Sequence, residues 1–194
     1  MYGSAKFLAK KSADEWRRIA AAGITRVHSG LESGDAVTLE QIHKGVDPES
    51  AIRAFNHVMA AGLELSVSPM MDGAGRELVP EHAEGSAEVL NRASPDFVRL
   101  RTFVPALGTD WCDRWQRGEL TLLNAHQALA ETRLLVERLN GPTMLLSDHV
   151  TNFLDVNGLL PDDKALMLDA IDEALEWPET RFRPPTERLI HLGL

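Results

Sequence analysis

An α/β fold with a parallel sheet of about four strands and flanking helices is the architecture that the sequence predicts. One supersecondary pattern repeats along the chain: a helix, a small or glycine residue, a short strand and a polar loop. Strands that alternate with helices pair in parallel through right-handed crossovers, which gathers the strand-to-helix loops at one edge. So few strands cannot close an eight-stranded barrel, and we expect an open doubly wound sheet or a partial (β/α) TIM-like barrel.

The first two units begin with helix-capping patterns. A Ser-x-x-Glu capping box opens a helix over 12–22, and the segment 24–28 that follows is typical of a strand. An Asp-Pro pair opens a second helix over 47–61, and residues 63–67 follow as an extended segment.

Two further units and a last helix complete the pattern. We expect helices at 80–91, 124–139 and 161–176, and strands at 97–101 and 143–146. The chain therefore divides into one domain over residues 1–176 and a C-terminal tail over residues 177–194.

Composition excludes several classes of protein. The chain has 194 residues, 44% of them hydrophobic, which is enough for one sizeable core. A net charge of −9 argues against general nucleic-acid binding, because phosphate neutralisation needs a basic surface. No apolar run approaches the roughly 20 residues that span a bilayer, and no signal-peptide pattern opens the chain, so we expect a cytoplasmic protein without membrane contact. The single cysteine, Cys112, cannot form an internal disulfide, and we interpret it as an incidental thiol.

Each strand has one polar and one apolar set of alternating residues, and these sets lie on opposite faces of a sheet. Parallel strands that are buried on both faces normally have continuous apolar sequences, which these strands lack. The polar set comprises Arg26, His28, Gly30, Glu32, Glu64, Ser66, Ser68, Arg99 and Arg101. We interpret it as the wall of a wet cleft that meets a polar ligand. The alternative is a solvated face that pairs its own charges, for example Glu64 with an arginine.

Several segments resemble, in order and spacing, the second half of radical S-adenosylmethionine (SAM) cores. The branch they resemble is that of iron–sulfur oxidoreductases similar to Elp3, MiaB and NifB. The segments are GLESGD at 30–35, KGV at 44–46, AAGLELS at 60–66, GRE at 75–77 with His82, PDFVRLRT at 95–102 and SDHVTNFL at 147–154. The similarity runs from about Ser4 to about Glu176.

The resemblance implies a set of residues that bind SAM. Glu32 would hold the ammonium group of the methionine end by a charge-assisted hydrogen bond, and Lys44 would meet the carboxylate. Ser68 falls near the expected ribose contact, and Gly73 and Gly75 belong to the glycine-rich turn that follows.

Each of these assignments has a simpler alternative or a departure from the family pattern. Glu32 could instead cap a helix, and Lys44 could be solvated at a helix carboxyl end. Asp72 stands where the branch has a glycine, at the point where the backbone approaches the ligand.

Arg99, Arg101 and His149 are the candidates for substrate binding. The two arginines would meet an anionic substrate, or alternatively neutralise Glu32 and Glu64. For His149 the simpler role is a structural hydrogen bond. No spacing signature supports a zinc site or a hydrolytic triad, so we predict no metal ligands and leave catalytic residues unassigned.

The sequence has no CxxxCxxC motif, which holds the [4Fe–4S] cluster in this family. Residues 1–8 resemble the end of the third barrel strand. The resemblance therefore implies a fragment of a radical SAM enzyme that keeps part of the SAM-binding wall and is inactive alone. The cluster would belong to a complete parent protein, and a complementary N-terminal half or a second copy would cover the open sheet edges. Two alternatives stay open: a non-catalytic half-barrel that serves as a binding or assembly module, and an unrelated α/β hydrolase or metal-dependent enzyme.

Overall fold

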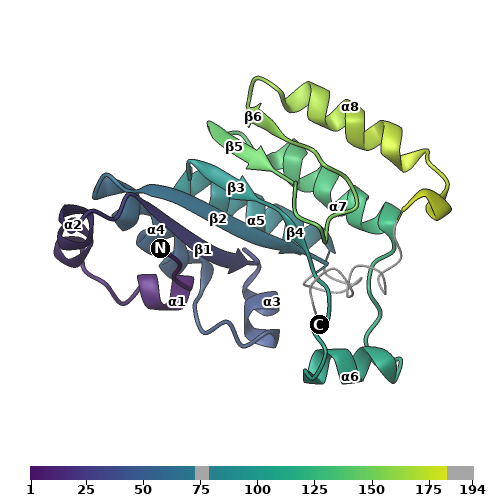
Figure 1. The fold of residues 1–194 in the computed structure, drawn as a ribbon, viewed down its shortest axis with the longest axis horizontal. Coiled ribbons are helices and arrows are strands. Elements are labelled where there is room, and N and C mark those ends of the chain that lie inside the picture. The colour runs from purple at the N-terminus through teal and green to yellow at the C-terminus, as the bar shows by residue number, and fades with distance from the viewer. Residues whose placement is uncertain (73–78, 183–194) are drawn as a thin grey trace.

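A mostly parallel sheet with helices packed behind it forms the centre of the molecule (Figure 1). The computed structural model describes residues 1–72 and 79–182. Its strands are β1 (Arg26–Glu32), β2 (Glu64–Met71), β3 (Phe97–Arg99), β4 (Arg101–Thr102), β5 (Thr143–Leu146) and β6 (Gly158–Leu160). Its helices are α1 (Ala5–Leu8), α2 (Ala13–Ala21), α3 (Ala36–Gln41), α4 (Pro48–Ala60), α5 (Val79–Ala93), α6 (Asp110–Gln116), α7 (Ala125–Arg138), α8 (Lys164–Leu175) and the 3-10 helix η2 (Glu179–Arg181).

The strands follow the order β1-β2-β3-β5-β6, and β4 pairs with the end of β2. Every strand pairing is parallel except that of β5 with β6. The carboxyl ends of the parallel strands therefore lie at one edge, as the crossover pattern predicts. The predicted α/β fold with an open, partial barrel is confirmed.

Predicted caps begin three of the helices. Ser12 and Glu15 form a reciprocal capping box at the start of α2, and Asn124 and Gln127 form another at the start of α7. Asp47 caps α4 through its carboxylate, directly before the proline that begins the helix. These caps satisfy backbone N–H groups that have no partner within the helix, so they fix where each helix starts.

The core lies between the sheet and the helices α4, α5 and α7, which cover the back of the sheet in the view of Figure 1. The apolar set of strand residues faces these helices. Its central members, all with 0% exposure, are Val27, Leu31, Leu65, Val67, Val98 and Leu145. Burial of such side chains is the main stabilising contribution to the domain, and it leaves the polar set on the opposite face.

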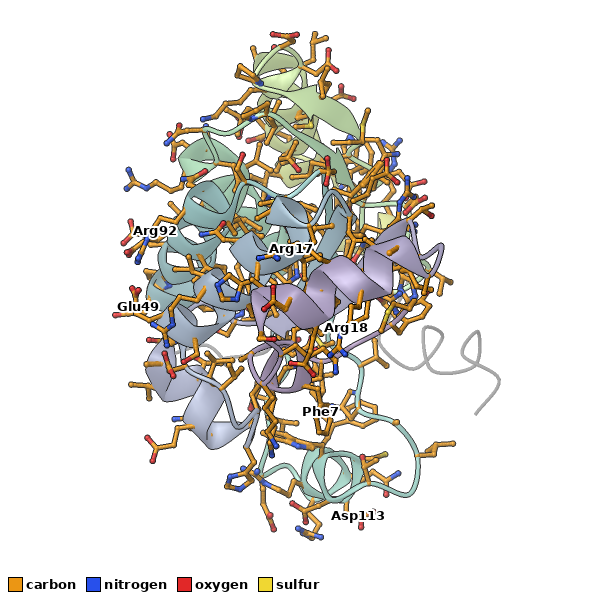
Figure 2. All side chains as sticks on the ribbon, turned by 90° about the vertical axis from the view of Figure 1, so that its left-hand side faces the viewer. Phe7, Arg17, Arg18, Glu49, Arg92 and Asp113 are labelled. Carbon is orange, nitrogen blue, oxygen red and sulfur yellow. The ribbon has the colours of Figure 1, made fainter. Side chains whose placement is uncertain are left out.

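An ion pair joins α4 and α5 at the surface. Figure 2 shows Glu49 and Arg92 next to each other, and Arg92 Nη2 lies 2.8 Å from Glu49 Oε2. The hydrogen bond from Arg92 holds the pKa of Glu49 below its usual value. Because both groups are exposed, the pair adds little to stability, and the two helices are held mainly by their buried faces.

The structure differs from the sequence predictions in several elements. The antiparallel strand β6 is absent from the predicted pattern, and so are the short helices α3 and α6. The last helix begins at Lys164 rather than at Pro161, because residues 161–163 form a turn. Residues 1–8 only begin as a strand: Tyr2 bridges His28 in parallel beside β1, and helix α1 follows.

The beginning of the predicted tail packs against the domain. Trp177 stacks on Phe182 with ring centroids 5.8 Å apart, and both side chains contact the hydrophobic core. Residues 183–194 lie outside the described part of the chain. Among the helices of residues 1–72 and 79–182, none combines the length and the apolar character needed to cross a membrane.

Candidate functional site

Glu32 and Lys44 meet at the carboxyl end of β1. Lys44 Nζ lies 2.7 Å from Glu32 Oε1, and the two side chains are only 14% and 24% exposed. The residue that caps α3 is Asp35, whose carboxylate accepts the backbone N–H of Thr38. The alternatives of a capping Glu32 and a solvated Lys44 are therefore wrong: the two residues form a half-buried ion pair at the edge where ligands bind in such sheets.

Gly30 makes room for the carboxylate of Glu32. A methyl group at Gly30 would lie 2.1 Å from Glu32 Oε1 and 3.3 Å from Lys44 Nζ. The register between β1 and β2 also shifts here, since Gly30 pairs with Ser68 and Glu32 pairs with Pro69. This irregularity and the positive φ of 63° at Glu32 turn its side chain back over the polar face of the strand.

The loop after Glu32 is held tightly by α5. The backbone N–H of Gly34 donates to Ser86 Oγ over 2.9 Å, in a fully buried contact. Gly34 and Gly85 touch through their backbones, because a methyl group on Gly34 would lie 2.1 Å from the Gly85 carbonyl oxygen. The end of β1 is therefore fixed by small side chains that allow close approach of the two segments.

The end of β2 carries the other predicted cofactor contacts. Ser68 is partly buried on the polar face, next to Gly30 of β1, whereas Ser66 is only 2% exposed. Ser66 is thus not part of an open polar wall. Gly73 and Gly75 lie outside the described residues. Asp72 has a φ of 65°, so it adopts the left-handed backbone that a glycine at this position would favour.

Arg99 and Arg101 differ in whether the side chain is paired with a neighbouring residue. Arg99 Nη2 lies 3.0 Å from Asp148 Oδ1, so its charge is already paired. The side chain of Arg101 has no hydrogen bond or ion pair with another described residue, whereas its backbone pairs with β2. The alternative that both arginines neutralise Glu32 and Glu64 is wrong, because Glu32 pairs with Lys44 and Glu64 pairs with Arg26.

His149 is held as a neutral hydrogen-bond donor beside Arg101. Its Nδ1 accepts the Thr151 backbone N–H over 3.3 Å and lies 2.8 Å from the Thr151 hydroxyl, which places the ring proton on Nε2. Burial lowers the pKa of His149, and the positive charges of Arg101 and Arg99 lower it further. The predicted structural hydrogen bond exists, and it leaves Nε2–H available for a ligand.

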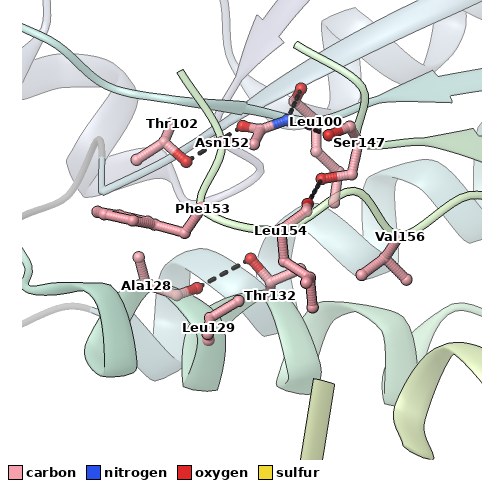
Figure 3. A pocket seen from close by; sticks show the side chains of 10 residues that line it. All are labelled: Leu100, Thr102, Ala128, Leu129, Thr132, Ser147, Asn152, Phe153, Leu154 and Val156. Carbon is pink, nitrogen blue, oxygen red and sulfur yellow. Dashed lines mark hydrogen bonds between the residues drawn. The ribbon is translucent and has the colours of Figure 1, made fainter. Parts of the chain in front are cut away.

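Hydrogen bonds of Asn152 and Ser147, drawn in Figure 3, hold the loop that follows β5. Asn152 Nδ2 donates to the carbonyl oxygens of Leu100 and Ser147, over 2.9 and 3.0 Å, and Ser147 Oγ donates to Leu154 O over 2.8 Å. These residues line a small cavity together with Thr102 and Thr132. The polar side chains around it form hydrogen bonds with one another or with the backbone, so we interpret the cavity as a structural feature. Because Ser147, Asp148 and His149 have separate partners, they do not form a hydrolytic triad.

The amino-terminal part of the polar face pairs its own groups. Arg26 Nε lies 2.8 Å from Glu64 Oε2, and the Arg26 guanidinium lies 4.2 Å from the centre of the Phe97 ring. Tyr2 stacks on His28 with ring centroids 4.9 Å apart. Burial lowers the pKa of His28, as do the N-terminal ammonium, Arg26 and Arg99. The alternative that Glu64 pairs with an arginine is therefore correct for this part of the face, and the candidate ligand site is limited to the carboxyl edge of the sheet.

Two buried residues lie beneath this edge: His82, which the resemblance includes but to which the sequence assigns no role, and Glu131, which sequence reasoning missed. His82 Nε2 lies 3.1 Å from the backbone oxygen of Glu32, and its Nδ1 lies 3.0 Å from Glu131 Oε1. The signal that could have found this pair is an ionisable residue on the apolar face of each helix, α5 and α7, because a buried ionisable residue needs a partner. Within the described residues, no group of three or more histidine, cysteine or acidic side chains is arranged to hold a metal.

The chain was compared with known proteins. No protein-family model matches it, and no curated protein matches it. Among solved structures it is similar to Elp3 of the archaeon Methanocaldococcus infernus with an N-terminal deletion, at 19% identity and a TM-score of 0.63, over 89% of this chain and 41% of that chain. It is also similar to methylornithine synthase (PylB), at 13% identity and a TM-score of 0.50, over 87% of this chain and 43% of that chain.

These similarities show the fold. Elp3 and PylB are both radical SAM enzymes, so the predicted resemblance is confirmed at the level of architecture. The chain spans less than half the length of either structure, 41% and 43% respectively.

Proposed function

We propose that this chain forms the carboxy-terminal part of a radical SAM core and that the Glu32–Lys44 pair holds the methionine end of SAM. The observation that carries this proposal is the 2.7 Å contact between Lys44 Nζ and Glu32 Oε1 at the carboxyl end of β1. The fold shared with Elp3 supports it, because ligands of parallel α/β sheets bind at this edge.

The chemistry of the pair suits an α-amino acid. The ammonium group of the methionine end replaces Lys44 as the partner of Glu32, and the carboxylate replaces Glu32 as the partner of Lys44. Each protein charge therefore exchanges one partner for another, which offsets the desolvation that binding requires. Ser68, beside Gly30, is the contact for the ribose, and Gly73 and Gly75 follow it in the sequence.

The [4Fe–4S] cluster does not fit this chain. Such a cluster takes three or four cysteine thiolates, and the sequence supplies only Cys112, which is buried in α6. When bound, SAM supplies a sulfonium group whose reductive cleavage needs that cluster. We therefore assign SAM binding to this chain and radical chemistry to a complete parent protein.

The substrate of the parent protein is anionic in this proposal. The side chain of Arg101 has no partner among the described residues, and the adjacent His149 presents a neutral Nε2–H. One cation and one neutral donor at the same strand ends suit a carboxylate or a phosphate group. Arg99, which is paired with Asp148, is a weaker candidate.

A partner that covers the front of the sheet completes the site. Within the described residues, the helices α4, α5 and α7 lie on one side, and the opposite face carries no comparable layer (Figure 1). The chain matches 41% of Elp3, which leaves room in that architecture for a complementary N-terminal half. A second copy of this chain is the other candidate for the same face, and light scattering at several concentrations separates the two.

Calorimetric titration with SAM and with S-adenosylhomocysteine tests the proposal. The native chain is expected to bind both ligands, and Glu32→Ala is expected to weaken both about ten- to a hundredfold, the loss of one charged hydrogen bond. Glu64→Ala is the matched control, because Glu64 lies on the same face and pairs with Arg26. Absence of binding by the native chain, or equal loss in both variants, would contradict the proposal.

A further inference from the structure

His82 and Glu131 form a fully buried link between the ends of two strands. Both side chains have 0% exposure, and His82 Nδ1 lies 3.0 Å from Glu131 Oε1. On one side, His82 Nε2 lies 3.1 Å from the backbone oxygen of Glu32 at the end of β1. On the other, Glu131 Oε2 accepts the backbone N–H of Asp72 over 2.7 Å, just after β2.

The proton positions in this link follow from its neighbours. The carbonyl oxygen of Glu32 can only accept a hydrogen bond, so Nε2 of His82 must carry a proton. His82 Nδ1 and Glu131 Oε1 lie 3.0 Å apart without the geometry of a hydrogen bond, and one of the two groups must carry a further proton, because two facing lone pairs would repel each other. The pair therefore buries no net charge, whereas a lone carboxylate at this depth would be strongly unfavourable.

Both residues held by the link have unusual backbone conformations. Glu32 has a φ of 63° and Asp72 a φ of 65°, in a region that residues other than glycine seldom occupy. Such conformations persist where the surroundings hold them in place, and they cluster at ligand sites. A second anchor holds Asp72, because its Oδ1 accepts the backbone N–H of Leu123 over 3.0 Å.

We infer that His82 and Glu131 are positioning residues that fix the backbone of Glu32, and with it the direction of the ligand-binding carboxylate, relative to the end of β2. This inference rests on the proposed function only in that Glu32 meets SAM. His82 acts through the Glu32 carbonyl oxygen, and Glu131 acts through His82 and the Asp72 amide. Neither side chain reaches the ligand, since both have 0% exposure.

Variants of the full chain can break the link at chosen points. In His82→Asn, the amide nitrogen replaces Nδ1 and keeps the contact with Glu131, but the bond to Glu32 is lost. In Glu131→Gln, the side chain can donate to Nδ1 and accept from the Asp72 amide, so the whole link is retained with a neutral histidine. Glu131→Ala removes both contacts. His57→Asn, at an exposed position near the end of α4, is the control for the histidine change.

The first readout is SAM affinity measured by calorimetry. His82→Asn and Glu131→Ala are expected to weaken binding about tenfold or more, while Glu131→Gln and His57→Asn stay within about threefold of the native chain. Native affinity in His82→Asn would overturn the inference and leave the proposed function standing. If Glu131→Ala does not fold, His82→Asn carries the comparison, because its contact with Glu131 is retained.

The second readout needs no ligand. Nitrogen NMR of the ring is expected to show that His82 Nε2 carries a proton, as its contact with the Glu32 carbonyl oxygen requires. Exchange of the Asp72 amide hydrogen is expected to be slow in the native chain and in Glu131→Gln, and fast in Glu131→Ala. An unprotonated Nε2, or slow exchange in Glu131→Ala, would overturn the inference. A native chain that shows the expected NMR results without binding SAM would instead contradict the proposed function.

Discussion

Gly34 lies so close to Gly85 that a methyl group on Gly34 would stand 2.1 Å from the Gly85 carbonyl oxygen. This contact brings the loop after Glu32 against the middle of α5, where Ser86 accepts the Gly34 N–H. The position of the carboxyl end of β1 is therefore fixed by backbone packing as well as by side-chain hydrogen bonds. Substitutions around this end of the strand test that account.

Gly34→Ala is expected to destabilise the domain and to move the Glu32 loop. The added methyl group meets backbone atoms that cannot rotate away, and such overpacking typically costs about 1–3 kcal/mol. Urea denaturation measures the loss. Gly141→Ala is the control, because its nearest neighbour is the Ser94 side chain at 3.3 Å. Equal stability of the two variants would show that the Gly34 contact is not tight in solution.

Gly30→Ala is expected to weaken SAM binding with little loss of stability. The methyl group occupies the space of the Glu32 carboxylate, whose Oε1 lies 2.1 Å from that position. Because this carboxylate is the flexible end of a side chain, it can move aside, but it then leaves Lys44. Calorimetry with SAM measures the effect, and unchanged affinity would argue that Glu32 binds no ligand in its present conformation.

His149 makes the domain less stable as the pH falls below about 6.5. Burial lowers the pKa of His149 below its ordinary value of 6.5, so the unfolded chain takes up the proton first. The stabilising contribution of the neutral ring is complete above pH 6.5 and is lost as the pH falls through the folded pKa. Thermal unfolding of the native chain and of His149→Gln from pH 5 to 8 measures this. A variant with the same pH slope below 6.5 as the native chain would contradict the expectation.

Arg101→Ala is expected to raise the pKa of His149. After burial, the charge of Arg101 is the largest cause that lowers this pKa, and the charge of Arg99 comes next. Removal of Arg101 should therefore raise it, and removal of Arg99 should raise it as well, because that change also frees the negative charge of Asp148 to act on the ring. NMR titration of the His149 ring in both variants measures these shifts, and an unchanged pKa in Arg101→Ala would show that the guanidinium does not act on the ring.

The sequence predicts those parts of the fold whose signals are local. The capping residues Ser12, Asp47 and Asn124 begin their helices as expected, because each cap depends on neighbours within one turn. The strand alternation correctly places Leu65 and Val67 in the core. The predicted cofactor residues Glu32 and Lys44 also meet in the structure, since the segment between them follows a strand end and contains only the short helix α3.

Features that depend on distant partners could not be predicted in the same way. Strand β6 is short, and its antiparallel pairing with β5 comes from packing rather than from its own alternation. Ser66 belongs to the polar set, yet tertiary packing leaves it 2% exposed. His82 and Glu131 lie on different helices, and only the fold brings them within 3.0 Å.

The most direct test of the central claim compares S-adenosylhomocysteine with 5′-methylthioadenosine, which lacks the amino-acid end. If the Glu32–Lys44 pair holds that end, the native chain binds S-adenosylhomocysteine much more tightly than 5′-methylthioadenosine. Glu32→Gln then loses affinity for S-adenosylhomocysteine by about tenfold or more and keeps its affinity for 5′-methylthioadenosine. Equal weakening of both ligands in Glu32→Gln, or no preference between them in the native chain, would contradict the account.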